Sequence, residues 1–200
     1  MKIFLDCEIT ELSKSGELIS IGLVSADNRT FYAELNDYNK DNISEWVKYN
    51  VIDNLLFTVD DDYCVRVKNR VVDAIIEEET DEEIVLEYDY GFNTELVGNK
   101  AKVGFELRLW LEQFKSVEIV GDCMPYDWVH LVDLLGNTAF DIPSNMNYIP
   151  IDICTMFHLK GIDPDISRET FIGNKVYGTK HNALYDALVI RECYKRLLNI

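Results

Sequence analysis

The first 35 residues constrain the fold most, because they contain three strand-like segments in close succession. Side chains in residues 2–8 alternate between the two faces of a strand. The strongly apolar segment 18–24 is typical of a buried strand, residues 26–29 are polar turn formers, and residues 31–35 indicate a returning strand. The sequence therefore predicts three antiparallel strands at its start.

The rest of the chain alternates between helix-like and strand-like segments. Residues 43–56 have apolar side chains near helical spacing, with Ser44 as a candidate N-cap. The later segments are an amphipathic helix at 105–114, a buried strand at 117–121, a helix that begins at Pro125, a strand at 149–153 and a last helix with Ala183, Ala187, Ile190, Tyr194 and Leu197 at core spacing. A length of 200 residues suits one globular domain. The sequence therefore predicts a single α/β domain over residues 1–200, with a mixed five-stranded sheet flanked by helices.

Residues from about 58 to 100 differ in character from their surroundings. They contain two acidic runs, at 60–62 and 77–83, a small basic cluster at 66–70 and a strand-like segment at 84–92. We interpret this stretch as an acidic insertion in the main domain, partly β and highly solvated. Two roles stay open for it: a charged hairpin or helix–loop without a part in the chemistry, or an arm that guides substrate or forms a dimer.

The overall charge argues at first against a nucleic-acid partner. The chain has 36 acidic and 19 basic residues, which gives a formal net charge of −17, whereas binding of phosphate groups usually needs a basic surface. Metal ions can answer this objection, because they turn a cluster of carboxylates into a phosphate-binding site. The remaining negative charge would then keep product and non-specific polyanions away.

The five cysteines, at positions 7, 64, 123, 154 and 193, form no C-x-x-C pair and no zinc-like spacing. Such a scattered, odd set, without a leader before the first strand, predicts reduced thiols and a cytoplasmic location. No apolar run reaches the length of a membrane span, so we expect no membrane partner. Cys7 would point to the opposite strand face from its acidic neighbours, so we expect it to pack in the core.

Acidic residues stand where the expected fold could bring them together. Asp6 and Glu8 are two positions apart and share one strand face. Asp127 follows a short apolar strand and a turn, at the start of a helix, where α/β folds place their sites. Each has a plain alternative: D-x-E pairs arise easily among 36 acids, and an aspartate is favourable at any helix N-terminus. Asp122 competes with Asp127, and we interpret it as a cap or turn residue.

His181 and Asp186 form the sharpest pair. The histidine stands at the start of the last helix, and the aspartate follows about one and a half turns later, beside the buried stripe. The other two histidines, His130 and His158, lack such a context, and we interpret them as structural. Carboxylates that converge on one point cannot all stay ionised without a cation between them. Hard oxygen ligands beside a base therefore indicate a magnesium or manganese site for phosphodiester cleavage.

These residues together resemble the DEDDh 3′–5′ exonucleases, a family with the RNase H-like fold that includes DnaQ-type proofreading subunits, RNase T and oligoribonuclease. The matching motifs are Asp6-Cys7-Glu8, Tyr126-Asp127-Trp128 and His181-Asn182-Ala183-Leu184-Tyr185-Asp186-Ala187. The resemblance is closest to the small bacterial 3′–5′ exoribonuclease branch, in which the apolar strand, the returning strand and the helix with Trp46, Val47, Asn50 and Val51 also recur. It covers residues 1–56 and 102–200 and leaves the stretch 58–100 unmatched.

The resemblance implies a metal-dependent 3′–5′ exonuclease that releases nucleoside monophosphates, with RNA favoured over DNA. Two ions, Mg²⁺ or Mn²⁺, would be held by the carboxylates of Asp6, Glu8, Asp127 and Asp186. His181 would act as the general base of the hydrolysis.

It also implies contacts with the 3′ end of the nucleic-acid substrate. Backbone amides near Ile9 and Thr10 would seat the terminal nucleotide. Leu12, Tyr126 and Trp128 are candidates for stacking on bases, with ordinary core or rim packing as the alternative. Relatives of this kind often pair, so a homodimer is a further expectation.

Three other functions stay open at this point. A 3′–5′ exodeoxyribonuclease would carry the same residues, because RNA and DNA are told apart by one or two contacts to the 2′-hydroxyl. A non-enzymatic acidic protein that mimics nucleic acid would account for the charge but requires neither the strand-face acids nor the H-x-A-x-x-D spacing. A degenerate exonuclease domain kept only for binding would be expected to have lost some of the five candidate catalytic positions.

Overall fold

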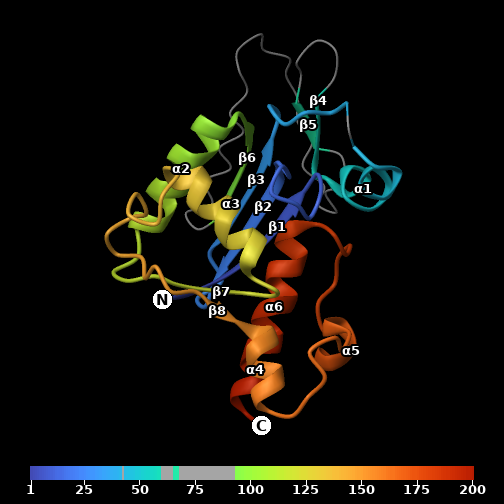
Figure 1. The fold of residues 1–200 in the computed structure, drawn as a ribbon, viewed down its shortest axis with the longest axis vertical. Coiled ribbons are helices and arrows are strands. Elements are labelled where there is room, and N and C mark those ends of the chain that lie inside the picture. Colours follow the sequence, from blue (N-terminus) through green and yellow to red (C-terminus); the bar gives the residue numbers. More distant parts are fainter. Residues whose placement is uncertain (42, 60–64, 68–92) are drawn as a thin grey trace.

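A computed structural model describes residues 1–41, 43–59, 65–67 and 93–200 of the chain. Its centre is a six-stranded mixed sheet with the strand order β6-β3-β2-β1-β7-β8, flanked by helices (Figure 1). The α/β class and the mixed sheet predicted from the sequence are confirmed. The sheet has one strand more than expected.

The three predicted N-terminal strands form one antiparallel unit. They are β1 (Lys2–Ile9), β2 (Leu18–Ser25) and β3 (Thr30–Leu35). Asp6 pairs with Gly22 across β1 and β2, and Ile21 pairs with Ala33 across β2 and β3. Every residue of β2 is buried, as its uninterrupted apolar run predicts.

The remaining three strands add to this unit in parallel. β7 (Glu118–Gly121) pairs with β1, β8 (Ile151–Asp152) pairs with β7, and β6 (Asn93–Gly98) pairs with β3. β6 is the unexpected strand, and it lies within the stretch interpreted as an insertion. Only its residues Leu96 and Gly98 are buried, so its sequence lacks the apolar signal of a central strand. β8 is shorter than expected, because Ile153 already begins a helix that is capped by the carboxylate of Asp152.

The described helices have the following bounds: α1 Glu45–Asn50, the 3₁₀ helix η1 Ile52–Asn54, α2 Lys100–Glu112, α3 Pro125–Leu135, α4 Ile153–Leu159, α5 Arg168–Ile172 and α6 Ala183–Leu198. Ser44 caps α1 as predicted, since its side chain accepts the amide of Val47. α2 begins five residues before the expected start at 105, because Asn99 caps it by accepting the amide of Lys102.

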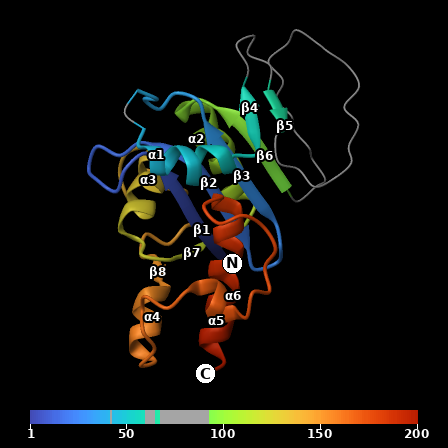
Figure 2. The same ribbon diagram turned by 90° about the vertical axis from the view of Figure 1, so that its right-hand side faces the viewer.

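The helices cover the two faces of the sheet unequally. The main apolar cluster fills the space between one sheet face and helices α2 and α3. A second cluster joins α4, α5 and α6 to the other face. Figures 1 and 2 show these three C-terminal helices grouped together, apart from α2 and α3. Among the described helices, none is long and apolar enough to cross a membrane.

Both described ends of the stretch 58–100 are attached to β3. At its start, the buried Glu34 of β3 accepts the amides of Leu56 and Phe57 at 2.6 and 3.1 Å and the hydroxyl of Tyr32 at 2.8 Å. Phe57 opens β4 (Phe57–Val59), which pairs with β5 (Val65–Val67). At its end, β6 pairs with β3 along its whole length. The acidic runs and the strand-like segment 84–92 lie outside the described residues, so the single domain with an insertion stays a prediction.

Candidate active site

The two acids of the first motif lie on the face of β1 that α6 covers. Leu5 and Cys7 point into the core beneath α2 and α3, whereas Phe4 belongs to the cluster around α6. Asp6 and Glu8 share the face of Phe4, because strand side chains alternate. The expectation that Cys7 packs in the core is therefore confirmed, and of the described cysteines all four are free thiols.

A glycine on β2 allows the N-terminus of α6 to lie directly on the sheet beside Asp6. Gly22 is the partner of Asp6 across the ladder. A Cβ atom at position 22 would come within 2.3 Å of the carbonyl carbon and oxygen of Ala183, so only a residue without a side chain permits this approach. The first turn of α6, which carries Asp186, is therefore seated over the strand pair that carries Asp6.

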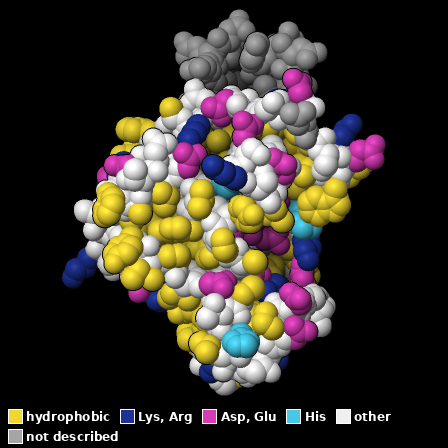
Figure 3. Space-filling view, viewed as in Figure 1, with side chains coloured by type: hydrophobic (Ala, Val, Ile, Leu, Met, Phe, Trp, Pro, Cys, Tyr) yellow, Lys and Arg dark blue, Asp and Glu magenta, His cyan; other side chains and the backbone are white. Residues whose placement is uncertain are grey.

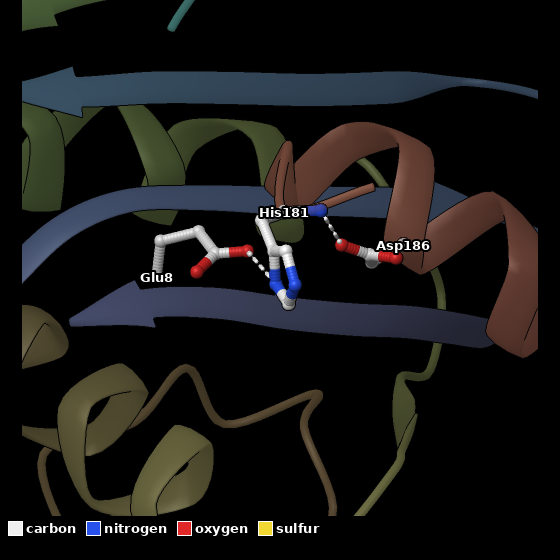
Figure 4. A group of neighbouring side chains, drawn as sticks. All are labelled: Glu8, His181 and Asp186. Atoms are coloured by element: carbon white, nitrogen blue, oxygen red, sulfur yellow. Dashed lines mark hydrogen bonds and ion pairs between the residues drawn. The ribbon is translucent and has the colours of Figure 1, made fainter. Parts of the chain in front are cut away.

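Glu8, His181 and Asp186 form a compact group at this point (Figure 4). Each offers one ligand atom, and these atoms all lie within 4.8 Å of one another. Nδ1 of His181 is 3.9 Å from Oε1 of Glu8, and the backbone amide of His181 donates to Oδ2 of Asp186 at 2.8 Å. His181 and Asp186, which the sequence singles out as a pair, are thus linked directly by a hydrogen bond.

Asp6 and Asp127 line the same cleft as this group. The cleft has a volume of about 550 Å³ and is bordered by all five candidate catalytic side chains. Asp127 reaches it from the first turn of α3, which Pro125 opens. The competing Asp122 is also at the cleft, but its carboxylate is occupied: it accepts Nε and Nη2 of Arg168 at 2.6 and 2.8 Å and the thiol of Cys154 at 3.0 Å. Asp122 is therefore an ion-pair partner that does not cap α3, and it lies in the bend between β7 and α3, as the turn prediction has it.

Burial raises the pKa of all four clustered carboxyl groups, and it is the largest cause in each case. The pKa of Asp6 lies well above its usual value, with added repulsion from Asp186 and Asp127. The pKa of Glu8 rises to about 8 through burial and the same two neighbours. Burial raises the pKa of Asp127 to about 8 and that of Asp186 to about 7. Four acids that resist ionisation together are the environment that a cation between them would relieve.

This donor set fits divalent cations of the magnesium type. Carboxylate oxygens are the hard ligands that such ions prefer. Two basic side chains line the cleft in the described part of the chain, and each has another acidic partner. Arg168 pairs with Asp122 at 2.6 Å, and Lys180 pairs with Glu169 at 3.3 Å. Lys180 lowers the pKa of Asp186 in part, but burial keeps that pKa raised, and bound cations would favour the ionised form.

The surroundings of His181 favour the neutral form of its imidazole, which can accept a proton. Burial, assisted by the nearby Lys180, lowers the pKa of its imidazole, against the opposing effect of Glu169. Its backbone φ of 62° lies in the left-handed region, which non-glycine residues seldom adopt. Its ring makes a T-shaped contact with the ring of Trp46, with the centroids 4.9 Å apart and an interplanar angle of 75°.

The structure places some of the expected substrate-contact residues at the cleft and others away from it. Ile9, Leu12 and Tyr126 line the cleft, and Leu12 is 76% exposed, so it is free to meet a ligand. Thr10 and Trp128 are not among the described residues that border it. The amide of Thr10 donates to the carbonyl of Glu17 at 2.9 Å and closes a loop. Trp128 packs against the main core instead.

Sequence reasoning did not assign Trp46, Arg168 and Lys180 to the cleft, although all three border it. Trp46 was attributed only to helical spacing, yet its side chain is 55% exposed. Lys180 directly precedes His181, a position that the motif leaves unspecified. Arg168 follows a polar loop, and nothing local in the sequence connects it with Asp122, 46 residues earlier.

The fold and the cleft define an α/β domain of the RNase H-like class. A structure of S. pombe Pop2p in a Mg²⁺- and Mn²⁺-bound form is similar to this chain, with a TM-score of 0.54, 12% sequence identity, and coverage of 98% of this chain and 82% of that chain. Among curated proteins, a sequence comparison finds no match.

The chain belongs to the family of the Rv2179c-like 3′–5′ exoribonuclease domain, whose model matches residues 1–198. The resemblance drawn from the three motifs is thereby confirmed. The protein is an enzyme, a 3′–5′ exonuclease, and the reading of its negative charge as nucleic-acid mimicry is set aside.

Proposed function

We propose that this protein removes nucleoside monophosphates one at a time from the 3′ end of RNA, with two Mg²⁺ or Mn²⁺ ions as cofactors. The observation that carries this proposal is the meeting of Asp6, Glu8, Asp127 and Asp186 in one cleft beside His181. The four carboxylates would hold the ions. Membership of an exoribonuclease family and the likeness to a protein whose structure is an Mg²⁺- and Mn²⁺-bound form support it.

The protein's own residues contribute binding and proton transfer. When bound, the ions would make an attacking water more acidic and neutralise charge on the phosphate. Glu8 and Asp186, whose pKa values burial raises, would be ionised as ligands, because a cation favours the ionised form. His181, kept neutral by burial, takes the proton of the attacking water as general base.

The cleft also suits the end of a nucleic-acid strand. Its volume of about 550 Å³ lies within the ~300–1,000 Å³ of typical ligand sites. Leu12 and Tyr126 offer exposed apolar surface at its border, on which the terminal base can stack. Ile9, at the end of β1, also borders the cleft and would be a further contact.

The choice of RNA over DNA is part of the proposal, with a 3′–5′ exodeoxyribonuclease as the alternative. It is tested with RNA and DNA oligonucleotides of one sequence, labelled at either end, in Mn²⁺, Mg²⁺ or chelator. We expect metal-dependent shortening from the 3′ end, faster for RNA. Asp186→Asn should abolish turnover while preserving an acceptor for the amide of His181. Turnover by this variant at the wild-type rate, or shortening from the 5′ end, would refute the proposal.

A second copy of the chain is the protein partner that we propose. Hydrophobic side chains gather on the face formed by α2, α3 and the segment that follows (Figure 3). Phe105, Leu109, Val129 and Phe140 are exposed there. Two chains of net charge −17 repel one another, so a face with few charges is the surface on which they can meet. Sedimentation of the wild type and of Phe105→Glu should show a dimer and a monomer, and a monomeric wild type would exclude it.

A further inference from the structure

The turn that carries His181 is fastened on both sides to one residue, Asn54 of η1. The side-chain amide of Asn54 donates to the carbonyl oxygen of Lys180 at 3.1 Å. The side-chain amide of Asn182 donates in return to the carbonyl oxygen of Asn54 at 3.1 Å. The residues before and after the histidine are therefore both bound to the same point, 126 to 128 residues away in the sequence.

Asn54 is itself anchored to the helix that contacts the histidine ring. Its side-chain nitrogen donates also to the carbonyl oxygen of Asn50 at 2.6 Å, at the end of α1. The ring of Trp46 on the same helix makes a T-shaped contact with the His181 ring. One short segment, residues 44–55, thus holds the backbone of the turn and limits the orientation of the His181 ring.

The hydrogen-bonding partners fix the orientation of both amide groups. Both partners of the Asn54 nitrogen are carbonyl oxygens, which can only accept. The side-chain oxygen of Asn182 accepts the amides of Leu184 and Tyr185 as the N-cap of α6, so its nitrogen faces Asn54. Asn182 is only 8% exposed, and without the Asn54 carbonyl this nitrogen would be buried without that partner.

The turn needs such support because its conformation is unfavourable. His181 has a positive φ of 62°, which for a non-glycine residue persists only when the surroundings impose it. The hydrogen bond from its backbone amide to the Asp186 carboxylate fixes one side of the residue. The bonds to Asn54 fix the chain on either side of it.

We propose that Asn54 is a positioning residue for His181, holding the imidazole where it can take a proton from the attacking water. The inference rests on the proposed function, in which His181 is the general base. Asn54 does not border the cleft among the described residues, so it acts through the histidine and not on the substrate. Its loss should lower kcat and leave KM nearly unchanged, because substrate binding does not use it.

The test is a double-mutant cycle measured on a short RNA in Mn²⁺. Asn54→Ala should lower kcat roughly 10–100-fold with KM within about twofold, since small misplacement of a catalytic group has large effects on rate. In the His181→Ala background the same substitution should change kcat less than about twofold. An equal loss in both backgrounds would overturn the proposal, because Asn54 would then act on something other than the histidine.

A second variant separates the loss of the hydrogen bond between Asn182 and Asn54 from a general loss of stability. Asn182→Ser keeps a good N-cap for α6 but is too short to reach Asn54, and it should reproduce the loss of kcat in Asn54→Ala. Asn99→Ala serves as the matched control, because it removes an asparagine that caps α2 away from the cleft. The control should lose stability without losing kcat. Wild-type kcat in a folded Asn182→Ser would overturn the proposal.

The imidazole NMR signals supply a readout without catalysis. The chain has three histidines, and the His181 signal is the one that disappears in His181→Ala. In Asn54→Ala this signal should shift or broaden while those of His130 and His158 stay in place, and an unmoved signal would overturn the proposal. If His181→Ala retained wild-type turnover, the proposed general base would fail, while this spectrum would still decide whether Asn54 holds the turn.

Discussion

Substituting Gly22 with alanine tests whether the close seating of α6 on the sheet assembles the active site. The added Cβ would stand 2.3 Å from the carbonyl of Ala183 and 2.4 Å from the nitrogen of Leu184. Both are backbone atoms, so no side chain can rotate away. Ordinary contact begins at 3.4 Å, so the first turn of α6 must move by about 1 Å, and a misplacement of that size can cost roughly 100-fold in rate.

The assay compares kcat on RNA with the free energy of unfolding in urea. Gly22→Ala should lose ~1–3 kcal/mol of stability through overpacking and about 100-fold in kcat at a temperature where it is fully folded. Gly161→Ala is the control, because Gly161 has a positive φ of 71° and nothing within 4 Å of its Cβ position. It should lose ~1–2 kcal/mol through the strained left-handed conformation and no kcat. A folded Gly22→Ala enzyme with wild-type kcat would refute the reasoning.

Other perturbations of the cleft have equally definite outcomes. The folded carboxyl pKa values of about 7 to 8 exceed the unfolded values of 3.8 to 4.5, so the folded state binds more protons between them and metal-free stability should fall as pH rises from ~5 to ~8. Melting curves in chelator should show a smaller fall for Asp127→Asn, and an identical fall would contradict the shift. His181→Ala should lower kcat by ~10²–10⁴ with Mn²⁺-induced stabilisation retained; its loss would make His181 a ligand instead. Arg168→Gln should cost ~2–3 kcal/mol in urea unfolding, below the ~3–5 of a fully buried pair, because Arg168 and Asp122 keep 15% and 21% exposure; an unchanged midpoint would contradict this.

The fold was predictable wherever one residue pattern had one structural meaning. The alternation in β1 and the unbroken apolar run of β2 fixed the antiparallel unit, because each pattern decides which faces are buried. The sequence pattern did not predict β6, because a half-exposed edge strand next to acidic sequence resembles a solvated loop. The early start of α2 was not predicted for a similar reason, because Asn99 caps a first turn that begins Lys100-Ala101-Lys102 and lacks an apolar stripe.

The candidate catalytic residues were predictable because their spacing carries the geometry. Asp6 and Glu8 share a strand face by alternation, and the interval from His181 to Asp186 spans the start of one helix. The substrate contacts were harder to predict, because they depend on how loops close. Nothing in the local spacing predicts the hydrogen bond from Thr10 to Glu17 or the packing of Trp128 against the main core. Asn54 could not be found in this way, since the two groups that connect it to the His181 turn, the carbonyl of Lys180 and the side-chain amide of Asn182, lie more than 120 residues away in the sequence.

The double attachment at Glu34 and β6 has a consequence for protein engineering. The chain departs from β3 where Glu34 binds the amides of Leu56 and Phe57, and it returns as a strand paired with that same β3. Exit and return thus both lie on β3, the exit at Glu34 and the return at Thr30, which pairs with Asn93. Replacing residues 60–92 by a short glycine-rich linker, or by a foreign reporter domain whose ends lie close together, should leave the nuclease framework intact.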